Sequence, residues 1–539
     1  MVRNKLRLLA VLLALALLLS GCSFLEHLYA QLMSNLNSSY MTPFSEMEYQ
    51  RPDFIQLSKK ANHCASLAES TDDLDALVES INDFYIAYND FYTNYALANI
   101  YYCKDLTDIY WEQEYTFCAE TAAQAEALRD SLNYTLADCP LKEELEGEEY
   151  FGEGFFDDFT GESIWDKTFT AMMEQEAQLI SRYYQLSEQS LEEDTYSESF
   201  YTGTGRDMAE LLAELVKLRQ TIATQAGYES YVDFAYDFYY DRDYTAAQAT
   251  DYLADISTTL TPLYRKLATM DIYSLAGSLS FAQQTYSYVQ ETATALGGIV
   301  EEAFLTMDSL KLYDIDYGET KYNASFEVFL PNYASPFIFM CPTLYARDQL
   351  TFAHEFGHFC NDYASGGSIV GIDVAEIFSQ GMEYLSLSCV EGREQLTKLK
   401  MADSLAIYIE QAAYASFEQQ MYSLSEAELN ADSITNLYGT VGTQFGFDSF
   451  MFDQRDFVFI GHFFTNPMYV ISYVVSNDAA LQLYQLEQAQ PGAGKQVLEN
   501  NLATTQPGFL AFLEEAGLES PFAEGRLESV KMLLESVFK

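Results

Sequence analysis

Apolar and aromatic residues recur at spacings of three and four along most of the chain, which is the pattern of amphipathic helices. The stretch 74–102 shows it most clearly, with few helix-breaking residues. The stretch 208–256 repeats the pattern and is interrupted at Gly227. Few segments have the residue pattern of a strand, and the best candidate is SFEVFLPNYASPFIFM at 325–340. Pro331 and Pro336 limit any strand there to short pieces or a sheet edge. The pattern therefore predicts a mostly α protein with a small β element.

Two polar stretches interrupt the helical pattern in the first part of the chain. Residues 143–163 are acidic and contain glycine, which predicts a loop. Residues 192–207 are polar and contain two glycines. We place a domain boundary there, so that a helical region spans 22–200 and a second domain spans 201–539.

The first 21 residues have the features of a secretory signal. Arg3, Lys5 and Arg7 precede an apolar run of 12 residues, 8–19, which is too short to span a bilayer of about 30 Å as a helix. The run ends in LSGC, which resembles a bacterial lipobox with Cys22 as the lipidated residue. The alternative is an ordinary cleaved signal with a chance cysteine. We expect an extracytoplasmic monomer, lipid-anchored to the bacterial cell membrane through Cys22.

The charge balance excludes one class of partner. The chain has 81 acidic and 28 basic residues, a formal net charge of −53. Such a chain repels nucleic acid, so we expect no nucleic-acid partner. Seven cysteines follow Cys22 without a CxxC pair, which argues against a zinc ribbon and leaves disulfide pairing open.

The stretch TFAHEFGHFCNDY, 351–363, carries the clearest chemical signal. The chain has only five histidines, and two of them, His354 and His358, stand four apart here. On a helix, positions i and i+4 share a face, so both side chains could bind one metal ion. Glu355 would then reach a water on that metal without binding the metal itself. The alternative is a helix with two histidines by chance, and a zinc site still needs a third protein ligand.

The segment after a glycine-bearing loop supplies candidates for that ligand. Asp373 could cap a helix, with Glu376 three residues on, as in a capping box. Glu376 and Glu383 stand seven apart and share a face. Glu383 could be the third ligand and Glu376 an outer carboxylate that orients a ligand histidine. The alternative is that both are solvated surface acids.

These motifs resemble the thimet oligopeptidase / oligoendopeptidase F family of zinc metallopeptidases. The resemblance rests on His-Glu-Phe-Gly-His at 354–358, on Glu383 at 25 residues after His358, and on the acid Glu376 seven residues earlier. Residues 215–234, 461–473 and 509–530 also resemble family segments, and the whole match covers about 205–539. The chain departs from the family at Asn361, where a histidine is common, and at 321–329, where the substrate-binding strand often carries glycines.

The resemblance implies a multi-helix, zincin-type metallopeptidase with a deep substrate channel. It implies one Zn²⁺ per chain, held by His354, His358 and Glu383, with an open position for water. Glu355 would act as general base, and three side chains of the late segment would stabilise the oxyanion, namely His462, Tyr469 and Tyr473. The implied activity is endopeptidase cleavage of oligopeptides, and the signal sequence places it at the bacterial cell surface. Extended peptides commonly pair with a sheet edge, and 337–340 is our candidate for that edge. Two alternatives are a related metallocarboxypeptidase or dipeptidyl carboxypeptidase, and a catalytically inactive peptide-binding lipoprotein.

Overall fold

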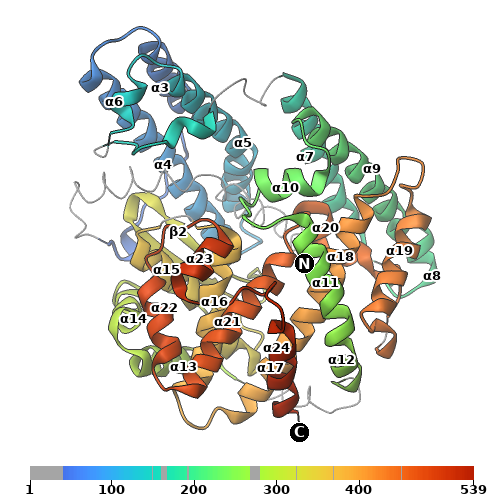
Figure 1. Cartoon of the computed structure of the whole chain (residues 1–539). Helices are drawn as coiled ribbons and strands as arrows, with labels where there is room; N and C mark the ends of the chain where they lie inside the picture. The colour runs from blue at the N-terminus through green and yellow to red at the C-terminus, as the bar shows by residue number, and fades with distance from the viewer. Residues whose placement is uncertain are drawn as a thin grey trace.

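The structure is a computed structural model that describes residues 41–539, apart from 148–149, 160–166, 191–192, 268–279, 323, 368–369, 451 and 539. The predicted signal peptide and Cys22 lie outside the described residues. Helices make up most of the described chain and one small sheet accompanies them, so the prediction of a mostly α protein is confirmed (Figure 1). Within the described residues, no helix is both long and apolar enough to cross a membrane.

Long helices begin the described part of the chain, and aspartates cap the first three of these. Asp53, Asp73 and Asp108 each accept a backbone N–H in the first turn of the helix that follows, which satisfies a donor that the helix itself cannot pair. The predicted helix at 74–102 is observed as α4, and its aromatic stripe is buried. The elements of this part are η1 (Phe44–Glu46), α3 (Phe54–Ala68), α4 (Leu74–Lys104), α5 (Ile109–Ala137), α6 (Lys142–Leu145), η2 (Phe155–Phe159) and α7 (Lys167–Ser190).

Shorter helices follow, up to the sheet. The break predicted at Gly227 is present, because α9 ends at Gln225 and Gly227 adopts a φ of 90° that favours glycine. The elements are α8 (Glu198–Thr202), α9 (Thr204–Gln225), α10 (Tyr231–Phe238), α11 (Ala246–Thr259), α12 (Thr261–Leu267), α13 (Ala282–Leu296) and α14 (Gly298–Leu310).

The sheet has three strands in the order β1-β3-β2: β1 (Tyr313–Asp314), β2 (Ser325–Leu330) and β3 (Ser335–Met340). β3 pairs parallel with β1 and antiparallel with β2, and every residue of β3 is buried. The prediction that 337–340 forms a sheet edge is therefore wrong, and β2 is the long edge strand. Pro336 has no N–H to donate to a neighbouring strand. It is tolerated in the central strand because β1 pairs only with the later residues Ile338 and Phe339, so that Pro336 has a partner on the β2 side alone, Phe329.

Helices after the sheet form the centre of the molecule. α15 (Arg347–Ser365) packs on the sheet and on α16 (Ile372–Ser388), and α16 packs in turn on α21 (Ile471–Ala489). The remaining elements are η3 (Pro331–Tyr333), α17 (Glu394–Ala406), the π-helical turn η4 (Ile407–Gln411), α18 (Ala412–Met421), α19 (Ala431–Gln444), η5 (Phe447–Ser449), η6 (Asp456–Phe459), α20 (Gly461–Thr465), α22 (Ala493–Asn501), α23 (Phe509–Ala516) and α24 (Arg526–Val537).

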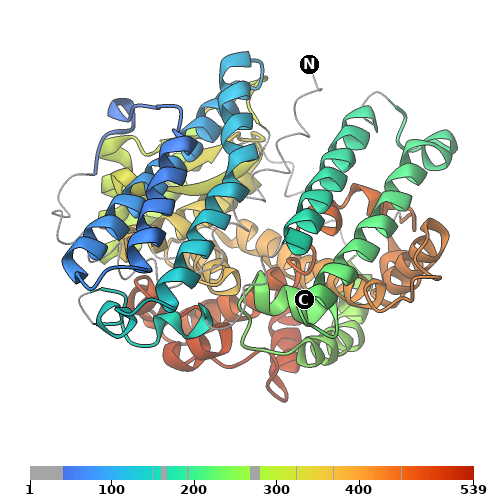
Figure 2. The ribbon, with the colours of Figure 1, turned by 90° about the horizontal axis from the view of Figure 1, so that it is seen from above.

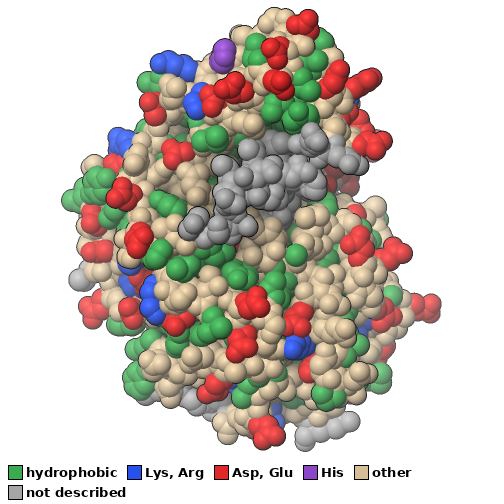
Figure 3. Space-filling model, turned by 90° about the vertical axis from the view of Figure 1, so that its left-hand side faces the viewer, with side chains coloured by type: hydrophobic (Ala, Val, Ile, Leu, Met, Phe, Trp, Pro, Cys, Tyr) green, Lys and Arg blue, Asp and Glu red, His purple; other side chains and the backbone are tan. Residues whose placement is uncertain are grey.

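Seen from above, α3, α4 and α5 stand on one side of the molecule, and α7 and α9 stand on the other (Figure 2). α7 packs along α9, although the predicted domain boundary near residue 200 lies between them. Acidic side chains are spread over the face drawn in Figure 3, with few basic ones among them, as the net charge of −53 requires. The seven cysteines of the described residues are unpaired, and six of them are buried.

Candidate active site

The site begins where α15 crosses α16 at very short range. Gly357 makes the crossing possible, because a Cβ at this position would stand 2.4 Å from the carbonyl oxygen of Phe378 and 2.6 Å from the Cα of Ser379. This explains the glycine between Glu355 and His358. The crossing places the histidine face of α15 against the acidic face of α16.

Three donors from the two helices gather at this crossing. One ligand atom each from His354, His358 and Glu376 lies within 4.8 Å of the others. His354 Nε2 and Glu376 Oε2 are 3.5 Å apart. Two ligand atoms on a tetrahedral zinc, each bound at about 2.0–2.1 Å, lie roughly 3.3–3.4 Å apart. The nitrogen, nitrogen and oxygen donors therefore fit a zinc ion in type, and the separation between His354 and Glu376 fits it in spacing.

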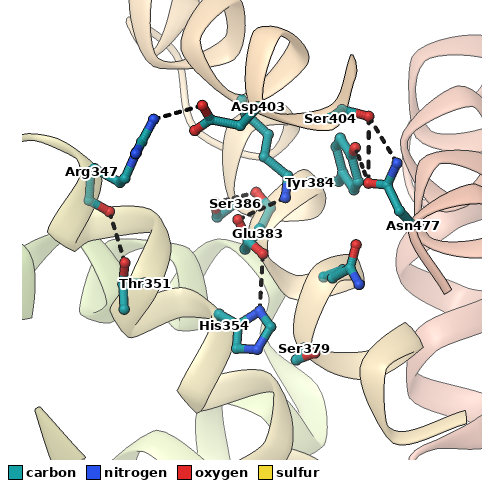
Figure 4. Close-up of polar contacts among 12 residues, drawn as sticks. Arg347, Thr351, His354, Ser379, Glu383, Tyr384, Ser386, Asp403, Ser404 and Asn477 are labelled. Atoms are coloured by element: carbon teal, nitrogen blue, oxygen red, sulfur yellow. Dashed lines mark hydrogen bonds and ion pairs between the residues drawn. The ribbon is translucent and has the colours of Figure 1, made fainter. Parts of the chain in front are cut away.

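Glu383 takes a different position from the one predicted. Its Oε1 lies 3.0 Å from His354 Nδ1 (Figure 4). Its Oε2 lies 2.8 Å from Lys400 Nζ. We predicted Glu383 as the third ligand and Glu376 as the outer carboxylate, but in this geometry it is Glu376 that lies with the two histidines. The reason is that both share one face of α16, and only the crossing with α15 decides which turn meets the histidines. Glu383 instead contacts His354 at Nδ1, whereas Nε2 is the ring nitrogen that faces Glu376.

Burial and charge set the protonation of the α15 side chains. Burial disfavours a charged His354, but the Glu383 hydrogen bond and the nearby carboxylates of Glu376 and Glu355 outweigh it and raise the pKa of His354 to about 9. Burial, and then the neighbouring His354, hold the pKa of His358 well below its usual value. Burial raises the pKa of Glu355 to about 7, although His354 opposes the shift. The Ser325 side chain, at the start of β2, also opposes the shift, and Glu355 can accept and return a proton near neutral pH.

The late segment groups its three predicted residues around Tyr469, which reaches Glu376. The Tyr469 hydroxyl lies 3.4 Å from Glu376 Oε1. The ring centres of His462 and Tyr469 are 5.4 Å apart, and those of Tyr469 and Tyr473 are 5.2 Å apart. Burial raises the pKa of both tyrosines, so their hydroxyls keep their protons and remain hydrogen-bond donors. Burial lowers the pKa of His462 to about 4, and its Nε2 has no partner among the described residues.

Arg242 holds this segment in place, and sequence reasoning missed it. Its guanidinium donates to the carbonyl oxygen of Met468 at 2.9 Å, to Ser472 Oγ at 2.9 Å and to Asp373 Oδ2 at 3.2 Å. Asp373 was predicted to cap α16, but the helix begins at Ile372, and Asp373 binds Arg242 and Tyr244 instead. Arg242 thus joins the start of the helix that carries Glu376 to the tyrosine segment. No motif indicates this role in the sequence, because the hydrogen-bond partners of the guanidinium lie more than 100 residues away.

Comparisons with known proteins agree with this architecture. Residues 44–161 match the Peptidase M3 N-terminal domain family. One solved structure, assigned to oligoendopeptidase F, has a TM-score of 0.77 at 20% identity, covering 92% of this chain and 98% of that chain. The chain has the fold of an oligoendopeptidase F.

Two further structures share this fold. PZ peptidase A, solved with an inhibitor, has a TM-score of 0.78 at 19% identity, covering 92% of this chain and 99% of that chain. A structure assigned to oligoendopeptidase F from Bacillus anthracis has a TM-score of 0.75 at 20% identity, covering 92% and 98% of the two chains. A comparison with curated protein sequences gives no match. The family match at 44–161 lies outside 205–539, where the sequence motifs were found, so the two observations are independent.

Proposed function

We propose that this protein is a zinc-dependent endopeptidase that cleaves oligopeptides. The observation that carries the proposal is the group of three donor atoms from His354, His358 and Glu376 within 4.8 Å of one another, with the buried Glu355 beside it. The Peptidase M3 N-terminal match and the oligoendopeptidase F fold support the same activity. In this assignment Glu376 is the third ligand, and Glu383 orients His354.

The roles of the surrounding residues follow from their positions. A zinc ion held by these donors supplies a Lewis acid that acidifies water and polarises a carbonyl. The Glu355 carboxylate accepts the proton of the attacking water and returns it to the departing amine. The edge strand β2 begins at Ser325, whose side chain acts on the Glu355 pKa, so a peptide extended along β2 would bring a carbonyl near Glu355.

The hydroxyls of Tyr469 and Tyr473 and the neutral ring of His462 would donate to the oxyanion. Tyr469 reaches Glu376, the other two residues lie against Tyr469, and at neutral pH each of the three keeps a proton to donate. Donors fixed in this way act chiefly in the transition state, because the negative charge they meet is absent from the bound substrate.

The decisive variant is Glu355→Gln, which keeps the shape of the side chain but cannot accept a proton. It should bind zinc as the unmodified protein does and lose at least about 10²-fold in peptide cleavage. Glu394→Gln, at an exposed position of α17, is the matched control and should keep full activity. Near-normal turnover by Glu355→Gln would remove Glu355 from the mechanism.

Peptides with an amidated C-terminus decide between endopeptidase and carboxypeptidase activity. An endopeptidase still cuts them, whereas an enzyme that recognises the free carboxylate does not. Zinc analysis of the purified protein tests the third possibility, an inactive peptide-binding lipoprotein. Loss of cleavage on amidation would favour the carboxypeptidase assignment.

We also propose that the enzyme is a monomer, anchored by lipid on Cys22 to the outside of the bacterial membrane, where it meets short peptides in a deep channel. The support is the LSGC sequence after a 12-residue apolar run. Cys22→Ala should abolish labelling with a lipid precursor and release the protein from the membrane fraction or block its processing. Unchanged processing and membrane retention in Cys22→Ala would exclude the anchor.

A further inference from the structure

Lys400 is a buried lysine that contacts Glu383, the carboxylate bound to the proposed zinc ligand His354. Its side chain is 2% exposed, and its Nζ lies 2.8 Å from Glu383 Oε2. The same Nζ stands 4.7 Å from the ring centre of Tyr384. A lysine is seldom buried unless a counter-charge compensates it, so this one must have a specific role in the packing or in the site.

Glu383 uses its two oxygens in opposite directions. Oε2 faces Lys400, and Oε1 binds His354 Nδ1 at 3.0 Å. The other ring nitrogen of His354, Nε2, faces Glu376 at 3.5 Å. Lys400, Glu383 and His354 therefore form a continuous polar chain through α17, α16 and α15, which ends at a proposed zinc ligand.

The helix that carries Lys400 is held on both sides. Asp403 of α17 pairs with Arg347 at the start of α15, with 2.6 Å between Arg347 Nη2 and Asp403 Oδ1 (Figure 4). Ser404 accepts a hydrogen bond from Asn477 of α21 at 3.0 Å. Lys400 is thus presented to Glu383 by a helix whose position is tied to α15, which carries His354, and to α21, which carries Tyr473.

We propose that Lys400 is a positioning residue: it holds Glu383 as the acceptor for His354 Nδ1–H, and so keeps His354 Nε2 aimed at Glu376 and His358. The inference rests on the proposed zinc function. It explains how two glutamates on one face of α16 take different roles, because Lys400 engages the carboxylate that must not turn towards the metal. Partners that orient a ligand histidine in this way affect metal affinity about 10- to 100-fold.

The test is the zinc dissociation constant, measured by competition with a chromophoric chelator. Lys400→Met removes the charge and keeps most of the volume, and it should raise the dissociation constant about 10- to 100-fold. Lys398→Met, at an exposed position of the same helix, should leave it unchanged. Tyr384→Phe removes the hydroxyl that donates to Asn477 at 2.8 Å but keeps the ring beside Lys400. It should lower the thermal stability without changing zinc affinity.

A double variant separates positioning from general damage. If Lys400 acts through Glu383, then Glu383→Gln/Lys400→Met should bind zinc no more than about threefold more weakly than the worse single variant, because the second change removes nothing further. The double variant also avoids an unpaired buried charge, so it should fold even if Lys400→Met does not. A double variant whose loss equals the product of both single losses would overturn the inference, as would Lys400→Met with unchanged affinity.

The outcome is distinct from a failure of the proposed function. If the unmodified protein holds no zinc, the proposed function fails. If the unmodified protein holds zinc and cleaves peptide while Lys400→Met keeps the same zinc affinity, only the role of Lys400 is wrong.

Discussion

Replacing Gly357 with alanine should damage the site while leaving the protein folded. The added Cβ would stand 2.4 Å from the Phe378 carbonyl oxygen, whereas ordinary contacts begin at 3.4 Å. The backbone of α16 cannot rotate away as a side chain can, so α15 and α16 must separate by about 1 Å. Donor atoms from both helices form the proposed zinc site, and it is their spacing that changes.

The size of the effect follows from two opposing contributions. Alanine in place of a helical glycine stabilises by up to about 1 kcal/mol, and overpacking a core costs about 1–3 kcal/mol. With a gain of roughly 0.5–1 kcal/mol, the net loss of stability lies between about 0 and 2.5 kcal/mol, which a folded domain of this size tolerates. A displacement of about 1 Å in a catalytic site, by contrast, costs roughly 10²-fold in rate.

Zinc competition and peptide cleavage measure the outcome. We expect Gly357→Ala to bind zinc at least about tenfold more weakly and to lose roughly 10²-fold in kcat/KM. Gly439→Ala is a matched control, because its Cβ also meets an atom at 2.4 Å, but that atom is the movable Oε1 of Gln454. Unchanged zinc affinity and kcat/KM in Gly357→Ala would refute the argument that this close crossing sets the spacing of the donors.

Three further predictions concern the residues around the donors. Glu376→Ala should lose most bound zinc, whereas Glu383→Gln should weaken binding only about 10- to 100-fold; the reverse order in metal analysis would restore Glu383 as the ligand. His462→Ala and Tyr473→Phe should lower kcat more than they raise KM, because donors to an oxyanion act chiefly in the transition state. Equal changes in kcat and KM, measured by steady-state kinetics, would argue against that role. Arg242→Lys keeps the charge but loses the planar guanidinium that reaches three partners, so it should lower kcat and leave the zinc content unchanged. An unchanged kcat in this variant would show that the tyrosine segment does not need Arg242.

Several features of the protein could be predicted from the spacing of residues close together in the sequence. The helix at 74–102 followed from a periodicity that depends only on neighbours three and four residues apart. The pairing of His354 with His358 on one face followed from the same geometry and is observed in α15. These features are set within one or two helical turns, so no distant part of the chain can alter them.

Contacts between distant segments decided the rest. Glu376 and Glu383 are equivalent by helical spacing, and only the crossing at Gly357 places one of them with the histidines. The prediction that 337–340 forms a sheet edge was wrong for the same reason. Whether a strand is central or at an edge depends on the strands that pair with it, and β3 has β1 on one side and β2 on the other. Lys400 and Arg242 acquire their roles from partners on other helices. The sequence by itself determined which helices form and which residues could bind a metal, because both depend on short-range geometry. The tertiary structure alone decided which of those residues meet, because that depends on how helices far apart in the chain pack.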